Sequence, residues 1–258
     1  MARLKIGVDI GALNLPPRQA LAAAAEMGAD AVEINGRGEL GPQLSQTGLR
    51  ELRKVLDDLR LRVSAVTFRT RRGYNTTAEL ERRVAATKAA MDWAHKLGAG
   101  VVVNHAGRVP GDTDSEAWRL LVEVLTDLAH HGNRAGAILA LETATDSGPD
   151  MARLLATLPD GLIGVDLNPG ALLLNGHSPL EAVAALGPRI LHVHATDAIL
   201  VPGGRSESTS LGEGSADFPG LLGALADHDY RGFFTVTAQT ASDSRTEIAD
   251  AVRYLRSF

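Results

Sequence analysis

Three side chains in the second half of the sequence, Glu142, Asp166 and His194, have the types and spacing of ligands for a divalent cation. Each of them closes a short apolar run that is typical of a buried strand. Two carboxylates neutralise the charge of Mg2+, Mn2+, Co2+ or Zn2+, and a neutral imidazole adds a directional ligand. Because only three protein ligands are offered, positions on the ion stay open for water and substrate oxygens. We therefore expect a metal site whose ion the sequence does not identify.

A structural role is the alternative for the same three residues. Glu142 and Asp166 could pair with buried arginines, and His194 could be a hydrogen-bonded core residue. Polar residues also close other apolar runs, among them Glu33, Arg69 and His105. Since a polar group at the end of a buried strand is costly without a partner, their convergence favours a shared functional site.

Eight apolar runs alternate with longer amphipathic segments along the whole sequence. The runs are rich in Val and Ile and do not alternate strictly with polar residues, which indicates strands buried on both faces. They comprise residues 5–10, 31–34, 63–68, 100–104, 137–142, 162–166, 190–194 and 232–237. Between them, apolar spacing predicts helices at residues 16–28, 49–59, 76–97, 114–130, 149–158, 179–186, 218–227 and 244–255.

Eight strand–helix units in 258 residues predict a single (β/α)8 TIM barrel spanning residues 1–258. An open, doubly wound sheet is the alternative, but no G-x-G-x-x-G phosphate loop follows the first run. In a barrel, the residues that close the strands meet at one end, where active sites are built. The Gly- and Ser-rich residues 201–215 read as a long loop at that end.

The composition narrows the class of function. Lys and Arg number 26 and Asp and Glu 31, so the net charge of −5 argues against a general nucleic-acid or membrane-surface binder. The absence of Cys excludes thiolate metal sites and a cysteine nucleophile. No apolar run approaches the roughly 18 residues of a membrane span, and the first residues lack a secretory pattern. We expect a cytoplasmic protein with a small-molecule substrate and no nucleic-acid or membrane partner; a homo-oligomer stays open.

A series of short motifs resembles the xylose isomerase-like TIM barrels, a group of sugar isomerases and epimerases that also contains relatives with the endonuclease IV fold. The resemblance covers nearly the whole chain and is specific for the superfamily rather than for one activity. The motifs, in order, are AVEI at 31–34, HKLGA at 95–99, HAG at 105–107, LE at 141–142, GVD at 164–166, HVHATD at 192–197, LGEG at 211–214 and YRG at 230–232.

The resemblance implies that Glu142, Asp166 and His194 bind the metal and that Glu142 is also the general base. A fourth ligand in that family is a Glu closing strand eight, in a Y-x-G-x4-E pattern, and the corresponding residue here is Thr237. Gln239, two residues further and on the same strand face, is a substitute ligand to consider.

The missing glutamate bears on the reaction. Family epimerases use the strand-five and strand-eight glutamates on opposite faces of the substrate, so Thr237 makes a two-base epimerase less favoured. An isomerisation through an enediolate needs Glu142 alone. We expect a metal-dependent sugar or sugar-phosphate isomerase- or epimerase-like enzyme. The alternatives are a metal-dependent lyase or dehydratase acting on a related polyol acid, and a non-catalytic carbohydrate-binding relative.

Further polar residues are expected to contact the substrate. Arg69, Arg71 and Arg72 could clamp a carboxylate or phosphate, or could lie in a solvated loop. The expected substrate contacts are Glu33, Arg69, His105, Asp197 and Arg205.

The endonuclease branch of the superfamily is disfavoured, because no D-x-H precedes the S-L-G-E-G segment at 210–214.

Overall fold

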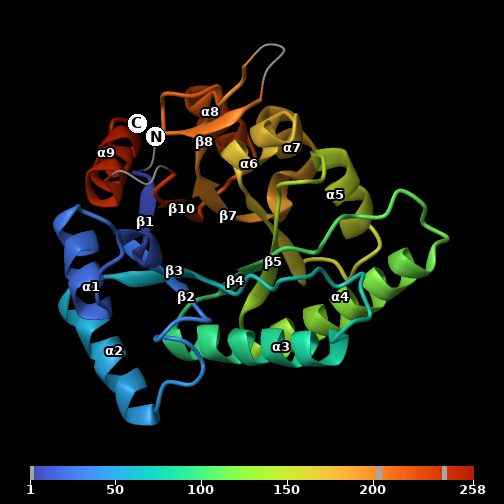
Figure 1. Ribbon diagram of the computed structural model, residues 1–258, viewed down its shortest axis with the longest axis horizontal. Coiled ribbons are helices and arrows are strands. Elements are labelled where there is room, and N and C mark those ends of the chain that lie inside the picture. Colours follow the sequence, from blue (N-terminus) through green and yellow to red (C-terminus); the bar gives the residue numbers. More distant parts are fainter. Residues whose placement is uncertain (1–2, 202–204, 240–242) are drawn as a thin grey trace.

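The protein, described here from a computed structural model over residues 3–201, 205–239 and 243–258, is built on a closed parallel barrel (Figure 1). The strands follow one another around the barrel in the order β1-β10-β7-β6-β5-β4-β3-β2. This closure confirms the predicted (β/α)8 barrel and rules out the open sheet. The barrel strands are β1 (Lys5–Asp9), β2 (Ala31–Asn35), β3 (Arg62–Thr67), β4 (Val101–Asn104), β5 (Ile138–Glu142), β6 (Ile163–Leu167), β7 (Ile190–Ala195) and β10 (Phe233–Val236).

Helices surround the barrel, and serine side chains fix where several of them begin. Ser45, Ser115, Ser147 and Ser178 each precede a helix, and the side chain of each accepts a hydrogen bond from the backbone N–H three residues further along. The eight predicted helices are present. Those at 179–186 and 218–227 have the predicted ends, and the ends of the other six differ by up to five residues. The helices are α1 (Pro17–Glu26), α2 (Gln46–Asp58), α3 (Leu80–Leu97), α4 (Glu116–Ala135), α5 (Gly148–Leu155), α6 (Pro169–Leu174), α7 (Pro179–Leu186), α8 (Phe218–Asp227) and α9 (Ser244–Arg256), with short 3-10 turns η1 (Ile10–Leu13) and η2 (Gly187–Arg189).

Two features were not predicted. Helix α6 follows β6 directly, and an antiparallel hairpin of β8 (Asp197–Ile199) and β9 (Glu207–Thr209) overlaps the predicted loop at 201–215. Residues 202–204 of that loop lie outside the described residues. No helix in the described part of the chain has the length and hydropathy to cross a membrane.

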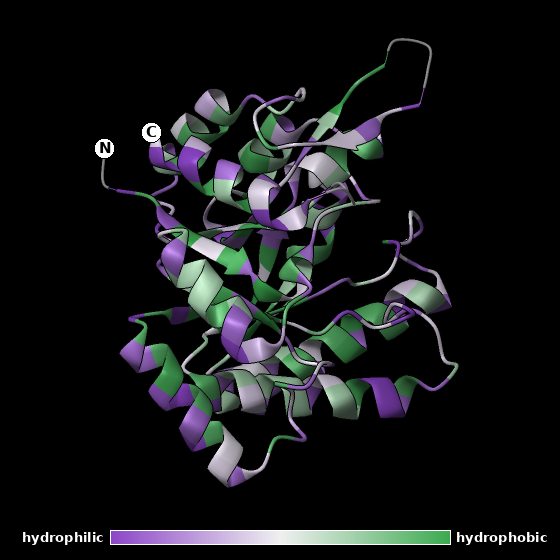
Figure 2. Cartoon of the chain, turned by 60° about the vertical axis from the view of Figure 1, so that its left-hand side comes forward, coloured by the Kyte–Doolittle hydropathy of each residue, from purple (hydrophilic) through white to green (hydrophobic). Residues whose placement is uncertain are grey.

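The apolar core lies mainly between the strands and the helices. Apolar residues are concentrated in the strands, and the outer helices alternate apolar and polar residues (Figure 2). Fully buried core side chains include Ile6, Leu139 and Val165. Alternate strand residues point into the barrel instead, and there the packing turns polar toward the carboxyl ends of the strands, which form the mouth of the barrel.

Gly7 on β1 shows how tightly this interior is filled. A Cβ atom at Gly7 would lie 2.6 Å from Thr235 Oγ1 and 2.9 Å from Ser64 Oγ. Those two hydroxyls are hydrogen-bonded to each other at 3.1 Å, and Thr235 Oγ1 also lies 2.7 Å from His192 Nε2. Glycine at this position therefore leaves space for the hydrogen bonds that connect Ser64, Thr235 and His192.

Candidate metal centre

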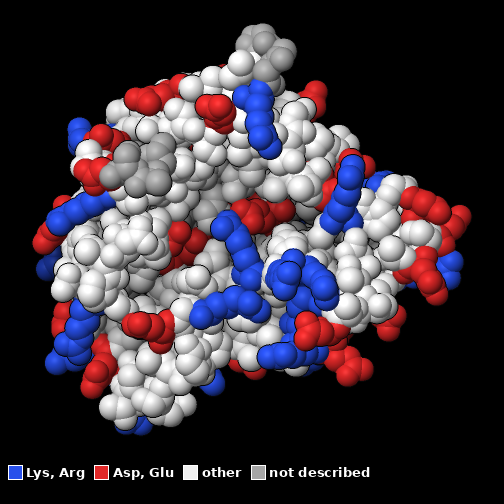
Figure 3. Space-filling view, in the orientation of Figure 1, with Lys and Arg blue, Asp and Glu red and all other residues white. Residues whose placement is uncertain are grey.

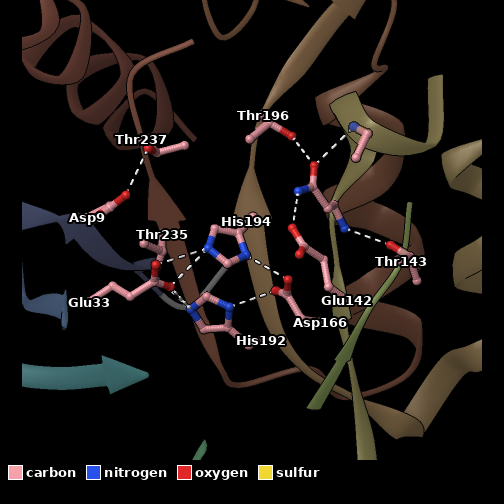
Figure 4. Close-up of polar contacts among 12 residues, drawn as sticks. Asp9, Glu33, Glu142, Thr143, Asp166, His192, His194, Thr196, Thr235 and Thr237 are labelled. Carbon is pink, nitrogen blue, oxygen red and sulfur yellow. Dashed lines mark hydrogen bonds and ion pairs between the residues drawn. The ribbon is translucent and has the colours of Figure 1, made fainter. Parts of the chain in front are cut away.

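The three predicted ligands meet at the mouth of the barrel (Figure 4). Glu142 ends β5, Asp166 lies on β6 and His194 on β7, so consecutive strands around the barrel supply them. One ligand atom from each lies within 4.8 Å of the others. Asp166 and His194 are buried, whereas the Glu142 side chain keeps 11% of its surface exposed toward the mouth. The structure thus assembles the set that spacing alone had suggested.

Asp166 is the centre of this arrangement because both of its oxygens are engaged by imidazoles. Its Oδ1 lies 2.8 Å from His192 Nδ1, and its Oδ2 lies 2.6 Å from His194 Nδ1. Burial alone would raise the pKa of Asp166, but the charge of His194 and the hydrogen bonds from both rings lower it to about 2. Asp166 is therefore ionised throughout the neutral range.

His194 lies between two carboxylates. Its Nε2 is 3.0 Å from Glu33 Oε2, and its Nδ1 faces Asp166. Burial disfavours the charged ring, but the two carboxylates outweigh this effect and raise the pKa of His194 well above its usual value. The two carboxylates thus favour a positive charge between them, which in the absence of a metal is the proton on His194.

Glu33 brings a second potential ligand set into contact with the first. Glu33, His192 and His194 also have ligand atoms within 4.8 Å of one another. Glu33 is 1% exposed, and its Oε2 has no hydrogen bond of acceptable geometry. This oxygen instead lies 3.0 Å from His194 Nε2 and 3.8 Å from His192 Nε2, so it is ion-paired with the two rings. Burial disfavours the charged carboxylate, but the charges of both rings and the hydrogen bond from His194 outweigh this effect and lower the pKa of Glu33.

Glu142 is held by neutral and cationic donors. Arg69 donates from Nη2 to Oε1 at 2.6 Å and from Nε to Oε2 at 3.0 Å, and Asn168 Nδ2 donates to Oε1 at 2.8 Å. Arg69 was expected to contact the substrate, and it instead contacts Glu142. The pairing is the structural alternative considered for Glu142, although the Arg69 side chain is 54% exposed rather than buried. The Arg69 guanidinium supplies positive charge to Glu142, as a bound metal ion would.

The opposite side of the mouth carries a carboxyl group that the sequence did not single out. Thr237 follows β10, the last strand of the barrel, and stands where the family pattern has its glutamate. Its Oγ1 donates a hydrogen bond to Asp9 Oδ2 at 3.1 Å. Burial, reinforced by the charge of Glu33, raises the pKa of Asp9. In the eight-strand order, β1 and β5 are four strands apart in either direction, so Asp9 and Glu142 close diametrically opposed strands.

The residues at the mouth fit a divalent cation. Two carboxylates and an imidazole are an accepted donor set for Mg2+, Mn2+ or Zn2+. Asp166 and Glu33, which flank His194, raise the pKa of that ring, so the charges at this site favour a cation. A family model of the xylose isomerase-like TIM barrel matches residues 21–258.

The chain belongs to the xylose isomerase-like TIM barrel family. An inosose dehydratase of Bacillus thuringiensis (strain Al Hakam) is 24% identical over 219 residues, covering 73% of this chain and 72% of the relative. Among solved structures, a xylose isomerase domain protein from Planctomyces limnophilus superposes with a TM-score of 0.87 at 21% identity, covering 99% of this chain and 97% of the other. A probable 3-DHS dehydratase involved in petrobactin synthesis in Bacillus anthracis gives 0.80 at 18% identity, with 98% of each chain covered. At these identities the structures show the shared fold.

The other predicted site residues do not join the cluster. His105 Nε2 contacts the backbone oxygen of Thr70. Asp197 accepts hydrogen bonds from four backbone N–H groups of the segment that follows it, and its contact with a substrate stays a prediction. Arg205 is exposed, and within the described residues no hydrogen bond or ion pair links it to the cluster. Gln239 bonds through its backbone N–H to Glu247, and its role as a ligand stays a prediction.

Sequence reasoning overlooked two residues that the structure brings to the mouth, Asp9 and Asn168. Asp9 lies in the predicted first strand, so the same attention to polar strand ends that found Glu142 could have found it. Asn168 accepts hydrogen bonds from the Ala171 N–H and the Thr196 hydroxyl, and donates to Glu142. Its dual role as helix cap and carboxylate partner has no signature in the sequence.

Proposed function

We propose that the protein is a divalent-metal-dependent dehydratase that removes a proton next to the carbonyl of a sugar-derived ketone and then eliminates water. The observation that carries this proposal is the pair of carboxyl groups on opposed strands, Glu142 and Asp9. Elimination needs a base for the carbon-bound proton and an acid for the departing hydroxyl. The raised pKa of Asp9 favours its protonated form, which is the form an acid requires.

The two carboxyl groups divide the reaction between them. Glu142 as carboxylate accepts the proton from the carbon beside the carbonyl, and the electron pair of that C–H bond forms the new carbon–carbon double bond. The neighbouring C–O bond breaks, and the hydroxyl leaves as water with the proton of Asp9. Afterwards Glu142 is protonated and Asp9 ionised, and exchange with solvent restores both.

A divalent cation held by Glu142, Asp166 and His194 would stabilise negative charge that develops on the substrate carbonyl oxygen. The chain's own groups orient this site. His192 and Glu33 hold the Asp166 carboxylate and the His194 ring in place from below. Arg69, paired with Glu142, orients the base toward the mouth.

The curated relative named as an inosose dehydratase supports dehydration of a cyclic or open-chain keto-polyol. Isomerisation is the second candidate. It is favoured by Thr237, because this residue leaves no second carboxylate on strand β10, and Glu142 alone could take a proton and return it on the same face. Both reactions begin with the same proton abstraction.

The test incubates Mn2+-loaded protein in heavy water with a keto-inositol and with unbranched ketoses. We expect deuterium at the carbon beside the carbonyl, and an enone absorbance where water is eliminated. Glu142→Gln should abolish both signals, whereas Glu123→Gln, an equal change at an exposed glutamate of α4, should leave them unchanged. Exchange at the wild-type rate in Glu142→Gln, or binding of the ketones without any exchange, would overturn the proposal.

A further inference from the structure

A cavity of about 240 Å3 is lined by five arginines: Arg37, Arg71, Arg72, Arg82 and Arg83. Figure 3 shows Lys and Arg side chains gathered on the rim of the central hollow, with acidic side chains deeper in it. Three lining residues, Thr70, Arg71 and Arg72, belong to the loop that follows β3, and three, Arg82, Arg83 and Ala86, belong to the N-terminal part of α3. This concentration of positive charge contrasts with the net charge of −5 of the whole chain.

Three of the five arginines are exposed and have no ion-pair partner among the residues that the structure describes. The acidic residue that lines the cavity, Glu79, lies 3.7 Å from Arg82. Arg37 stacks over the Phe68 ring at 4.9 Å. Arg37, Arg71 and Arg72 form no ion pair within the described residues, and all three are exposed. Guanidinium groups held close together repel one another, and an oxyanion among them would relieve that repulsion.

A buried donor at the cavity points to a ligand independently of the exposed arginines. Arg83 is only 9% exposed, and its terminal nitrogens donate to the backbone oxygens of Ala78 and Thr76. Its Nε is buried and lacks a hydrogen-bond partner. The guanidinium is thus fixed in position by its two terminal nitrogens, while its third nitrogen has no partner among the described residues. Helix α3 also begins here after Glu79, without a side-chain cap for its first N–H groups.

The loop joins this cavity to the candidate metal centre. Arg69 contacts Glu142, and Arg72, three residues further, lines the cavity; three residues span at most about 10 Å. The loop between them is held by a hydrogen bond from the Thr70 hydroxyl to the backbone oxygen of Arg72. The metal centre and the cavity therefore share one short, internally hydrogen-bonded loop.

We propose that the arginine-lined cavity is a subsite for the phosphate group of the substrate, which makes that substrate a phosphorylated keto-polyol. This inference rests on the proposed function and adds the substrate class. A phosphate monoester carries close to two negative charges at neutral pH and offers three acceptor oxygens, which suits several guanidinium groups better than a single carboxylate does. A volume of about 240 Å3 fits an end group rather than an extended polyanion.

The experiment titrates inorganic phosphate into the metal-free protein by calorimetry. The wild-type chain should bind one phosphate, and the double variant Arg71→Gln/Arg72→Gln should bind it at least tenfold more weakly. Arg50→Gln/Arg134→Gln removes the same charge from exposed sites on α2 and α4 and should bind as the wild type does. Absence of saturable binding, equal affinity in both double variants, or displacement of phosphate by an oligonucleotide at stoichiometric concentration would overturn the subsite.

The same titration separates this inference from the proposed reaction. Glu142→Gln lacks the base but keeps the cavity, so it should bind inorganic phosphate like the wild type. Phosphate binding together with no proton exchange on any ketose would reject the reaction and keep the subsite. Proton exchange together with equal phosphate affinity in the Arg71→Gln/Arg72→Gln variant would reject the subsite and keep the reaction.

Discussion

Thr237 Oγ1 donates a hydrogen bond to Asp9 Oδ2, so the strand that lacks its family glutamate holds a carboxyl group of the neighbouring strand. β1 and β10 are paired in parallel, which brings the ends of the two strands together at the mouth. A carboxyl group is therefore still present on this side, supplied from β1. Its raised pKa suits it to give a proton rather than to take one or to bind an ion.

Replacing Asp9 by Asn should separate the two halves of the reaction. Loss of the acid should slow water elimination by about 100- to 10,000-fold. Deuterium exchange by Glu142 should continue near the wild-type rate, because the base and the metal ligands are intact. Both rates can be followed in one sample by NMR and enone absorbance. Thr237→Val, which removes the hydrogen bond but keeps the carboxyl group, should show a smaller loss; equal losses of exchange and elimination in Asp9→Asn would contradict the assignment.

Metal binding should become tighter as the pH rises. Asp166 and Glu33 raise the pKa of His194, which favours the protonated ring, and an ion can bind the ring only after that proton leaves. Displacement of one proton gives about a tenfold gain in affinity per pH unit below that pKa. Calorimetry in buffers of different ionisation enthalpy measures the proton release directly.

Glu33→Gln is the variant that tests this explanation. It removes one of the two carboxylates that raise the pKa of His194 while keeping the side-chain shape. The dependence of Mn2+ affinity on pH should become shallower near neutrality, and fewer protons should be released. Glu123→Gln serves as the matched control on an exposed surface. An unchanged pH dependence in Glu33→Gln would show that the proton lies elsewhere.

Gly7→Ala should destabilise the fold by about 1–3 kcal/mol, because the added Cβ would collide with the Thr235 and Ser64 hydroxyls. Gly100→Ala is the matched control, since a Cβ there meets no atom within 4 Å. Urea unfolding of the two variants measures the difference. Equal free energies of unfolding would mean that the barrel interior is less tightly packed than these contacts indicate.

The strands of the barrel were predictable because buried parallel strands produce apolar runs, and because their ends follow from those runs. Glu142, Asp166 and His194 could be found for the same reason, since position at a strand end is readable from sequence. The hairpin of β8 and β9 was not, because its strands are three residues each and Gly and Ser in that segment are typical of a loop.

The partners of the charged side chains were the least predictable part of the site. Arg69 has a long side chain on a loop, and whether it meets Glu142 or a substrate depends on the path of that loop. Asp197 was expected at the substrate because it follows His194 by three residues. The N–H groups that occupy its carboxylate come from a loop up to nineteen residues away, which no local pattern shows.

Glu142, Asp166 and His194 are expected to bind one divalent cation together. Titration of Mn2+ into the protein, followed by the loss of the free-ion EPR signal, tests it most directly. We expect one Mn2+ per chain in the wild type and in Glu123→Gln, and binding weakened at least tenfold in Glu142→Gln. No bound Mn2+ in the wild type, or equal binding in Glu142→Gln, would contradict the account.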